Sequence, residues 1–363
     1  MNDDLFFMRL ALREARKGVG RTSPNPAVGA VVVKDGRVVG KGYHKKAGTP
    51  HAEIHALNAA GTKAAGATIY VTLEPCNHTG RTPPCSQAVL AAGIRRVVIG
   101  MSDPNPLATG GGDFLAGQGL EVTRGVLAEE CAAINRPFVK YVTSGLPWVI
   151  MKAGMSLDGR IATHTGHSGW ITNAQSRAAV HRLRNRVDAI LIGVDTALAD
   201  DPSLTTRLAR GHGRDPLRVV LDTNLRLPAT AKMLLQESAA PTWIFCGPRP
   251  DPAKVRALEA AGAVVKAVAL AADGRLELTA VLRELAAQQL TSVLVEGGGS
   301  VHGAFLREGL VDEVNLYLAP CFIGGDGVPV VGPMGIDTVQ GARRLNAMRT
   351  RRFGDDLLIE GRF

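Results

Sequence analysis

The chain has 363 residues, which is enough for two domains that each bury a hydrophobic core. Apolar residues make up 45% and charged residues 21%, a globular balance that excludes a largely disordered protein. No apolar run is long enough to span a membrane, so we expect no membrane partner. The net charge of +9 indicates either an ordinary solvated surface or attraction of phosphorylated ligands or nucleic acid. Aromatic residues are only 4%, which argues against a surface that stacks single-stranded bases.

The start of the chain and its cysteines predict a cytoplasmic protein. Asp3 and Asp4 make the first residues acidic, unlike the basic start of a secretory signal. Five cysteines are an odd number in a long chain and suggest no disulfide framework. We therefore expect a reducing compartment, and we interpret Cys131, Cys246 and Cys321 as small buried hydrophobic residues.

The first 145 residues alternate between helix and strand patterns. Residues 4–17 predict a helix because apolar side chains recur at helical spacing, and Asp35-Gly36 between two apolar runs predicts a β-hairpin. The other expected elements are helices at 51–60, 86–92 and 128–141 and strands at 67–73, 95–100 and 120–126. This alternation predicts an α/β layer domain, in which the glycine-rich residues 110–113 form a flexible surface loop.

A turn-rich segment at residues 143–147 predicts a boundary between two domains, 1–145 and 146–363. Beyond it we expect strands at 148–153, 189–194, 218–222, 242–246, 264–268, 292–296, 314–320 and 356–360, and helices at 174–187, 278–288 and 301–308. This pattern predicts a second, mostly parallel sheet with helices on both faces.

A set of metal-ligand residue types lies in the first domain. His51, Cys76 and Cys85 supply one imidazole and two thiolates, which is the three-ligand set of a catalytic zinc site with an open fourth position. Zinc lowers the pKa of its bound water from about 15.7 to about 7 and so provides hydroxide at neutral pH. Glu53, two residues after the histidine at a helix start, would not ligate the metal but would move protons between the water and a leaving nitrogen.

The order of these residues is typical of zinc-dependent base deaminases, in which His-x-Glu precedes Pro-Cys. Eight residues separate Cys76 from Cys85 here, whereas the general pattern has two. The alternative is that both cysteines are merely buried and that His51 caps a helix. Because each cysteine follows a proline and the chain order is right, the pattern favours the zinc site.

A glycine-rich turn lies in the second domain, directly after the strand expected at 292–296. Residues 297–300 read Gly-Gly-Gly-Ser and lead into a helix, where backbone N–H groups can bind phosphate. The sequence matches neither the dinucleotide-binding nor the P-loop glycine pattern, so an NTPase is not expected. A purely structural turn is the alternative.

Several stretches together resemble a known family, the bifunctional riboflavin-biosynthesis deaminase–reductases. In the first domain these are residues 22–29, residues 51–53 and the long segment 76–85, whose wide cysteine spacing is a feature of that family. In the second domain they are residues 152–160, 168–172, 199–202 and 295–299. The resemblance covers essentially the whole chain. It implies an α/β fold class with an N-terminal cytidine-deaminase-like domain and a C-terminal dihydrofolate-reductase-like domain.

For the first domain, the resemblance implies hydrolysis of the 2-amino group of 2,5-diamino-6-ribosylamino-4(3H)-pyrimidinone 5′-phosphate. One Zn²⁺ would be held by His51, Cys76 and Cys85, with Glu53 as the proton shuttle. Asn25 and His44 are implied pocket residues that bind substrate. His78 and Arg81, between the two thiolates, are expected either to meet the substrate phosphate or to be solvated.

For the second domain, the resemblance implies hydride transfer from NADPH to C1′ of the ribose in its open-chain imine form. The implied cofactor contacts are Gly154, Trp170, Thr196, Asp200, Thr223, Gly298, Gly299, Ser300, Val301, His302, Gly303 and Ala304. The implied substrate contacts are Ser168, Arg184, Leu204, Arg207 and Glu296. A guanidinium fork matches phosphate oxygens, so the two arginines suit the substrate phosphate.

Some roles remain open at this point. Lys152 and Asp200 are interpreted either as proton-handling groups or as a salt-bridge partner and a cap, and Trp170 either as a cofactor contact or as core. Asp158 with the following glycine is expected to form a turn. Arg226 is the candidate for the group that binds the 2′-phosphate of NADPH.

The alternative functions are a nucleic-acid-editing zinc deaminase with a non-catalytic second domain, and a zinc-stabilised binding protein without activity. We favour an enzyme that binds no nucleic acid. Family analogy implies a homo-oligomer, either a dimer or a tetramer.

Overall fold

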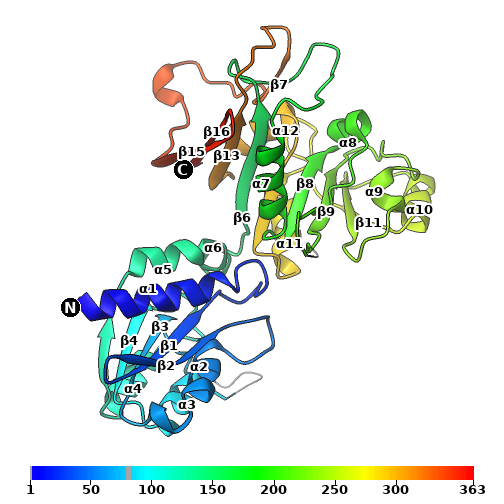
Figure 1. The fold of residues 1–363 in the computed structure, drawn as a ribbon. Coiled ribbons are helices and arrows are strands. Elements are labelled where there is room, and N and C mark those ends of the chain that lie inside the picture. The colour runs from blue at the N-terminus through cyan, green and yellow to red at the C-terminus, as the bar shows by residue number, and fades with distance from the viewer. Residues whose placement is uncertain (1, 79–82, 212) are drawn as a thin grey trace. The chain divides into compact units, whose positions relative to one another are not determined.

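The computed structural model describes residues 2–78, 83–211 and 213–363 (Figure 1). The chain divides into two compact units, Met1–Leu146 and Pro147–Phe363. In the described part of the chain, no helix combines the length and the apolar character of a membrane span.

The first unit is built on one sheet, which has five strands among the described residues, in the order β2-β1-β3-β4-β5. The strands are β1 (Gly29–Lys34), β2 (Arg37–Tyr43), β3 (Thr68–Leu73), β4 (Arg96–Met101) and β5 (Glu121–Arg124). The helices are α1 (Asn2–Arg16), α2 (Ala52–Ala60), α3 (Cys85–Ala91), α4 (Gly111–Gly117), α5 (Ala128–Ile134) and α6 (Arg136–Ser144), with a 3-10 turn at Gly61–Ala64. Strands β3, β4 and β5 run parallel, and β1 is antiparallel to both of its neighbours.

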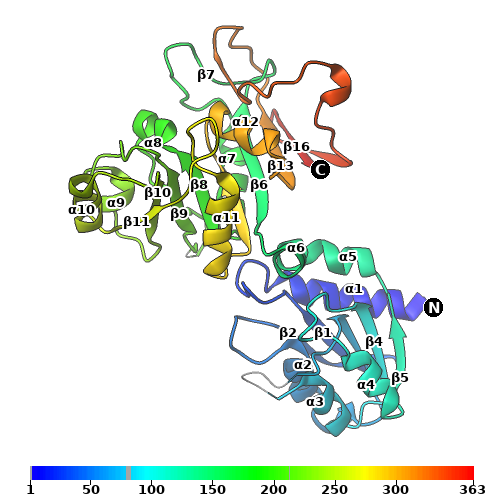
Figure 2. The same cartoon turned by 180° about the vertical axis from the view of Figure 1, so that it is seen from behind.

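Each strand of this sheet presents alternate residues to opposite faces, as the pleat requires. Val32 and Ile69 pack on one side with apolar residues of α2, α3 and α4. Val31 and Tyr70 pack on the other side with α1 and α5. The sheet is therefore covered on both faces, and α2 and α3, at whose N-termini His51 and Cys85 lie, are on one of them (Figures 1 and 2).

The prediction of a flexible surface loop at residues 110–113 is wrong. Helix α4 begins at Gly111, and both Gly111 and Gly112 are buried. A Cβ at Gly111 would overlap the carbonyl oxygen of Pro75, and the Gly112 N–H donates to Glu74 Oε1 at 2.9 Å. The glycines allow the backbone of α4 to pack closely against the segment that carries Cys76. A local sequence pattern does not reveal such a contact between distant residues.

The second unit contains a larger sheet, with nine strands among the described residues, in the order β11-β10-β9-β8-β12-β6-β13-β16-β15. These strands are β6 (Trp148–Met155), β8 (Ala189–Gly193), β9 (Leu217–Leu221), β10 (Thr242–Cys246), β11 (Ala263–Ala267), β12 (Ser292–Val295), β13 (Glu313–Leu318), β15 (Ala347–Phe353) and β16 (Asp356–Arg362). A short pair, β7 (Arg160–Ala162) with β14 (Val328–Pro329), stands apart from it. The sheet is parallel from β11 to β13 and antiparallel at β16 and β15, so it is mostly parallel, as expected.

Helices cover both faces of this sheet. They are α7 (Ala174–Arg184), α8 (Val194–Asp200), α9 (Lys232–Leu235), α10 (Pro252–Ala260), α11 (Leu278–Ala287) and α12 (Gly299–Arg307), with a 3-10 turn at Val339–Gly341. Helix α7 lies on the face seen in Figure 1, and α11 and α12 lie on the face seen in Figure 2. The short elements β7, β14, β15, α8, α9 and α10 were not anticipated.

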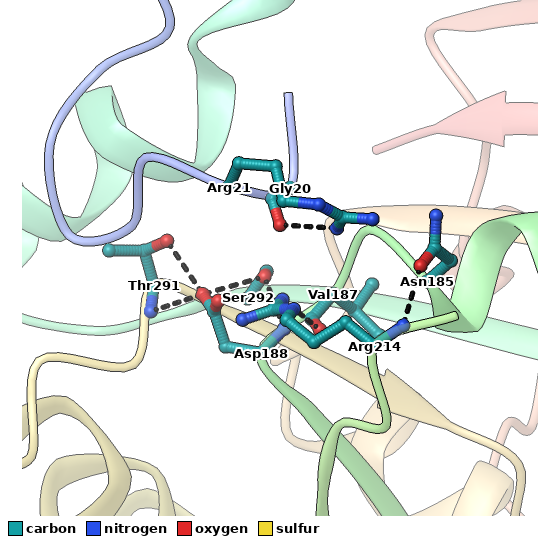
Figure 3. Close-up of polar contacts among 8 residues, drawn as sticks. All are labelled: Gly20, Arg21, Asn185, Val187, Asp188, Arg214, Thr291 and Ser292. Atoms are coloured by element: carbon teal, nitrogen blue, oxygen red, sulfur yellow. Dashed lines mark hydrogen bonds and ion pairs between the residues drawn. The ribbon is translucent and has the colours of Figure 1, made fainter. Parts of the chain in front are cut away.

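A buried carboxylate joins two neighbouring parallel strands at their N-terminal ends (Figure 3). Asp188, just before β8, accepts hydrogen bonds from the Thr291 backbone N–H at 3.0 Å and from the hydroxyls of Thr291 and Ser292 at 2.9 Å each. Arg214 donates to the same carboxylate at 3.3 Å. The contacts fix the register of β8 against β12, and hence the place where both strands end.

The cysteines outside the metal-ligand set differ from one another. Cys131 and Cys246 are buried, as expected, and all five cysteines are free thiols. Cys321 is exposed, so its interpretation as a buried residue is wrong. It follows β13 in a segment whose backbone contacts the turn after β6, through the Leu157 N–H and the Cys321 carbonyl oxygen at 2.8 Å.

Candidate active sites

Three potential metal ligands meet in the first unit. His51 precedes α2, Cys85 begins α3, and Cys76 lies in the segment after β3. His51 Nδ1 lies 3.2 Å from Cys85 Sγ and 3.6 Å from Cys76 Sγ, and the three ligand atoms lie within 4.8 Å of one another. The His51 side chain forms no capping hydrogen bond with its helix, which removes the support for the helix-cap alternative.

These distances fit a tetrahedral zinc ion. With Zn–S bonds of about 2.3 Å and Zn–N bonds of about 2.0–2.1 Å, the ligand atoms of a tetrahedron lie roughly 3.5–3.8 Å apart. A set of one imidazole and two thiols is also the donor chemistry that zinc prefers. The residues present therefore fit one Zn²⁺ with a fourth position left for a small molecule.

Hydrogen bonds within the ligand set polarise the two thiols. Contacts from Cys85 and His51 lower the pKa of the Cys76 thiol to about 4. The hydrogen bond to Cys76 and burial raise the pKa of the Cys85 thiol. The hydrogen bond to Cys76 raises the pKa of His51. The cluster thus already stabilises one thiolate, the form that ligates metal.

Glu53 stands beside this cluster with unused hydrogen-bonding capacity. It lies in the first turn of α2, only 3% exposed, and Oε2 has no hydrogen-bond partner among the described residues. Burial raises the pKa of its carboxyl to about 7. A buried carboxylate oxygen without a partner is costly, so its retention here points to a ligand that completes it.

His44 and Asn25 form a second layer of this site. The rings of His44 and His51 lie edge to face, with centroids 5.2 Å apart. His44 Nδ1 is 3.3 Å from the Pro50 carbonyl oxygen and Nε2 is 3.5 Å from Asn25 Nδ2. Burial and the neighbouring His51 lower the pKa of His44 to about 4, so the ring is neutral at pH 7. The structure thus places His44 next to His51 of the potential metal-ligand set, and Asn25 next to His44.

Two acidic residues near the ligands escaped the sequence analysis. Glu74 is buried and accepts hydrogen bonds from Thr109 Oγ1 at 3.2 Å and from the Asp103 backbone N–H at 3.3 Å, besides that from α4. Burial raises the pKa of Asp103 to about 6. Only the position of Glu74 directly before Pro-Cys hinted at such a role. His78 is exposed, and Arg81 lies outside the described residues.

A cavity of about 850 Å³ lies in the second unit, which is within the size range of ligand sites. Residues at the C-terminal ends of β6, β8 and β12 line it together with the start of α12, where ligands of open α/β sheets bind. The predicted contact residues that line it are Gly154, Ser168, Trp170, Arg184, Thr196, Asp200, Arg207, Glu296, Gly298, Gly299, Ser300, Val301 and His302.

A buried ion pair forms one wall of this cavity. Arg184 Nε and Nη2 donate to the two carboxylate oxygens of Glu296 at 2.8 Å each, and Lys152 Nζ adds a contact at 3.2 Å. Burial alone would raise the pKa of Glu296, but Arg184 and Lys152 hold it below its ordinary range. Lys152 is thus a salt-bridge partner that also faces the cavity, so both of its suggested roles remain compatible with the structure.

The glycine-rich turn approaches a neighbouring segment closely. A Cβ at Gly299 would overlap the carbonyl oxygen of Pro329, and one at Gly298 would lie 3.3 Å from Thr196 Oγ1. His302 Nδ1, one turn later in α12, is 2.9 Å from the Val330 carbonyl oxygen. The first N–H groups of a helix lack intrahelical partners. The start of α12 with the glycines before it, called the cradle below, therefore fits a phosphate group.

A second cavity of about 410 Å³ continues from the first and shares Gly193, Asp195, Ser300 and Val301 with it. Its lining includes the predicted residues Thr223 and Ala304. Arg226 also lines it and forms an exposed ion pair with Asp195. The two cavities together offer an elongated site with the helix start between them.

Four predicted residues stand out by their surroundings. Leu204 and Gly303 line neither cavity as far as the described residues show, and Leu204 belongs to the hydrophobic core. Trp170 is 77% exposed, with the Arg177 guanidinium 4.2 Å from the ring centroid, so its interpretation as a core residue is wrong. Asp200 accepts from the Ser168 hydroxyl at 3.2 Å.

Asp158 lies in the turn expected for it, but it has a further role. Its carboxylate accepts hydrogen bonds from the Ser156 hydroxyl and from the Ile323 and Gly324 N–H groups, the last at 2.7 Å. The hydrogen bond from Ser156 and those from the two backbone N–H groups lower its pKa to about 2. The turn after β6 is thereby fastened to the segment that leads into β14.

These two sites define a class of protein: a zinc-dependent deaminase unit followed by an α/β reductase unit. The first half matches the family model described as "Cytidine and deoxycytidylate deaminase zinc-binding region" over residues 1–101, and the second half matches "RibD C-terminal domain" over residues 147–359. The chain belongs to the RibD family of riboflavin-biosynthesis proteins. It is therefore an enzyme with a zinc-dependent deaminase and an NADPH-dependent reductase, and the second half has the dihydrofolate-reductase-like fold that was expected.

Relatives support this membership along the whole chain. The riboflavin biosynthesis protein RibD of Bacillus amyloliquefaciens is 44% identical over 356 residues, covering 98% of this chain and 95% of that protein. The RibD protein of Escherichia coli is 40% identical over 372 residues, covering 98% of each.

Solved structures agree. RibD from Acinetobacter baumannii is similar with a TM-score of 0.89 at 36% identity, covering 99% of both chains. A diaminohydroxyphosphoribosylaminopyrimidine deaminase/5-amino-6-(5-phosphoribosylamino)uracil reductase from Thermotoga maritima has a TM-score of 0.87 at 37% identity, again covering 99% of both chains. The predicted family and fold class are confirmed. Nothing in these similarities supports the nucleic-acid-editing alternative.

Proposed function

We propose that residues 1–145 deaminate 2,5-diamino-6-ribosylamino-4(3H)-pyrimidinone 5′-phosphate, and that residues 146–363 then reduce its ribosyl side chain. The product would be 5-amino-6-(5-phospho-D-ribitylamino)uracil. The observation that carries the proposal is the convergence of His51, Cys76 and Cys85 beside the unpartnered carboxylate oxygen of Glu53. The names of the structural relatives support the choice of substrate.

In the deaminase, His51, Cys76 and Cys85 would hold Zn²⁺, which when bound supplies a nucleophile by lowering the pKa of water. Hydrolysis adds the water oxygen to C2 of the pyrimidine and releases the amino group as ammonia. Glu53 would accept a proton from the water and pass it to the departing nitrogen, since no donor among the described residues contacts its Oε2. Neutral His44 and Asn25 orient the ring through hydrogen bonds.

The test of this half is Glu53→Gln, which keeps the shape of the side chain but cannot carry the proton. We expect unchanged zinc content and a loss of ammonia release of about 100-fold or more, which is the size of a general acid–base contribution. Reduction of the deaminated substrate by the same preparation should be unaffected. Unchanged ammonia release would remove Glu53 from the mechanism.

In the reductase, NADPH would extend across both cavities, with its phosphates at the start of α12 and its adenosine end beside Thr223. Bound there, the cofactor supplies the hydride. Gly298, Gly299 and Ser300 would present backbone N–H groups to the phosphates, and Gly154, which lines the larger cavity, would lie beside the nicotinamide. Arg226 is proposed to bind the 2′-phosphate at the far end.

The substrate of the reductase would lie in the larger cavity, beside Ser168, Arg207 and the Arg184–Glu296 pair. Hydride adds to C1′ of the imine, and a proton must reach the nitrogen. Lys152 is a candidate donor of that proton because it lines the same cavity. Ammonia release without subsequent NADPH oxidation, measured on one preparation, would refute the reductase half.

Assembly and location are also proposals. The family resemblance supports a homo-oligomer, dimer or tetramer, which light scattering coupled to size-exclusion chromatography would test. Five free cysteines support a reducing compartment such as the cytoplasm.

A further inference from the structure

His181 lines the larger cavity but has no part in the functions given above. It lies on α7, one turn before Arg184, so both side chains emerge from the same helix face. The Arg207 backbone N–H donates a hydrogen bond to His181 Nδ1 at 3.2 Å. A backbone N–H can only donate, so Nδ1 is an acceptor and the ring proton of the neutral form resides on Nε2.

The surroundings keep this imidazole neutral. Burial, together with the positive charges of Arg184 and Arg207, lowers the pKa of His181 to about 4. Arg184 is committed to Glu296 through two hydrogen bonds and to the Thr205 carbonyl oxygen through a third. By contrast, the Arg207 side chain forms no hydrogen bond or ion pair within the described part of the chain.

This corner of the cavity therefore holds one uncommitted guanidinium and, next to it, one ring N–H. Nδ1 faces the backbone of Arg207, the ring also contacts the backbone of Thr205, and His181 lines the cavity. A phosphate group takes donors of both kinds, since it has several acceptor oxygens and carries negative charge. A neutral donor adds to such a site without adding repulsion between cations.

We infer that His181 is a substrate-binding residue of the reductase, whose Nε2–H donates to the substrate phosphate while Nδ1 holds the backbone of Arg207 in place. The inference rests on the proposed reductase function and makes that site more specific. It assigns phosphate recognition to the pair His181 and Arg207, with Arg184 acting chiefly on Glu296.

Two isosteric variants separate the roles of the two ring nitrogens. His181→Asn places an oxygen near the position of Nδ1 and keeps the acceptor for Arg207, but it has no donor near Nε2. His181→Gln places an amide N–H near Nε2 and loses the acceptor. Each is assayed in the full chain with the deaminated phosphorylated substrate and with its dephosphorylated analogue. Ammonia release by the first unit shows that the chain is intact.

We expect His181→Asn to raise the KM for the phosphorylated substrate about 10-fold or more, the size of a lost hydrogen bond to a charged group, with kcat within about twofold. The KM for the dephosphorylated analogue should not change. His181→Gln should regain most of the phosphate preference. Arg182→Gln, on the same helix but outside the lining residues, controls for a substitution on α7 that does not reach the cavity.

Two results would overturn the inference. One is a wild-type KM in His181→Asn together with an impaired His181→Gln enzyme. That result would mean that His181 acts only through its contact with the Arg207 backbone. The other is an equal loss for both substrates, which would make the effect independent of phosphate. If the wild-type chain oxidises no NADPH with either substrate, the proposed reductase function itself has failed, and this outcome is distinct from the other two.

Discussion

Arg184 and Glu296 meet through two parallel hydrogen bonds of 2.8 Å in the wall of the larger cavity. Their side chains are only 13% and 8% exposed, so both charges have left most of their water. Such a pair adds little to the free energy of unfolding compared with a well-packed apolar pair, but removing only one of its two charges is strongly destabilising. Glu296 thereby fixes the guanidinium of α7 against the end of β12.

Substitution Glu296→Gln should therefore destabilise the second unit, because it leaves Arg184 buried without a counter-charge. We expect a fall in the free energy of unfolding of about 3–5 kcal/mol at pH 7. All three tryptophans, Trp148, Trp170 and Trp243, lie in the second unit, so urea unfolding followed by tryptophan fluorescence reports on that unit. A change below about 1 kcal/mol would contradict the prediction, because exposed pairs contribute that little.

The same pair predicts an acid dependence of stability. The pKa of Glu296 in the folded protein lies below its ordinary value of 4.5, so its contribution is fully present above that value and is lost as the pH falls toward the folded pKa. Between pH 5.5 and pH 3.5, roughly spanning that ordinary value, wild type should lose more stability than Glu296→Gln does. Parallel curves for the two proteins would show that Glu296 is not the group that titrates.

Removal of zinc should separate the two activities. A chelator such as dipicolinate should abolish ammonia release, because no residue among the described ones replaces the metal's role at His51, Cys76 and Cys85. NADPH oxidation with the deaminated substrate should persist within about twofold, since the reductase needs no metal in our proposal. Metal analysis should find one zinc per chain before treatment. Persistent ammonia release after complete zinc loss would exclude this metal centre.

Substitution Gly299→Ala should weaken cofactor binding. The added Cβ would overlap the Pro329 carbonyl oxygen, so α12 and β14 must separate and the N–H groups at the start of α12 must shift. We expect the Kd for NADPH, measured by calorimetry, to rise about 10-fold or more, as for misplaced charge-assisted hydrogen bonds. Gly325→Ala is the matched control, because a Cβ there meets nothing within 4 Å. An unchanged Kd for Gly299→Ala would exclude the cradle as the phosphate site.

Substitution Arg226→Ala should reduce the preference for NADPH over NADH. Within the described residues Arg226 forms its ion pair with the exposed Asp195, and it can exchange that carboxylate for a phosphate at little cost. The Kd for NADPH should rise about 10-fold while the Kd for NADH stays the same. Arg256→Gln, exposed on α10 and outside both cavities, controls for net charge. Equal changes for both cofactors would place the 2′-phosphate elsewhere.

Local patterns predicted those parts of the fold and site that depend on nearby residues. The hairpin at Asp35-Gly36 forms with both residues at positive φ, as its turn type requires. The zinc site was recognisable because few residue types bind zinc and their order along the chain is restricted. Most helices and strands of both sheets also lie within a few residues of their expected bounds.

Features that depend on distant contacts were missed. Helix α4 forms where glycines meet Pro75, about 35 residues earlier in the chain, and composition alone suggested a loop. The orientation of His181 is set by the backbone of Arg207, which no motif records. Cys321 looked like an ordinary buried cysteine, but the path of its segment past the turn at Leu157 leaves it exposed.

The hydrogen bonds from the Ile323 and Gly324 N–H groups to Asp158 have a consequence for the order in which the second unit folds during its synthesis. They unite residues near the beginning of the second unit with residues near its end, and β13 adds to the sheet beside β6 in the same way. Most of this unit is therefore synthesised before Val328 and Pro329, which line the larger cavity, have been added to the chain. During synthesis Cys85, the last of the potential metal ligands, is added about 200 residues before the glycine turn at 297–300, and truncation near the C-terminus should abolish the reductase first.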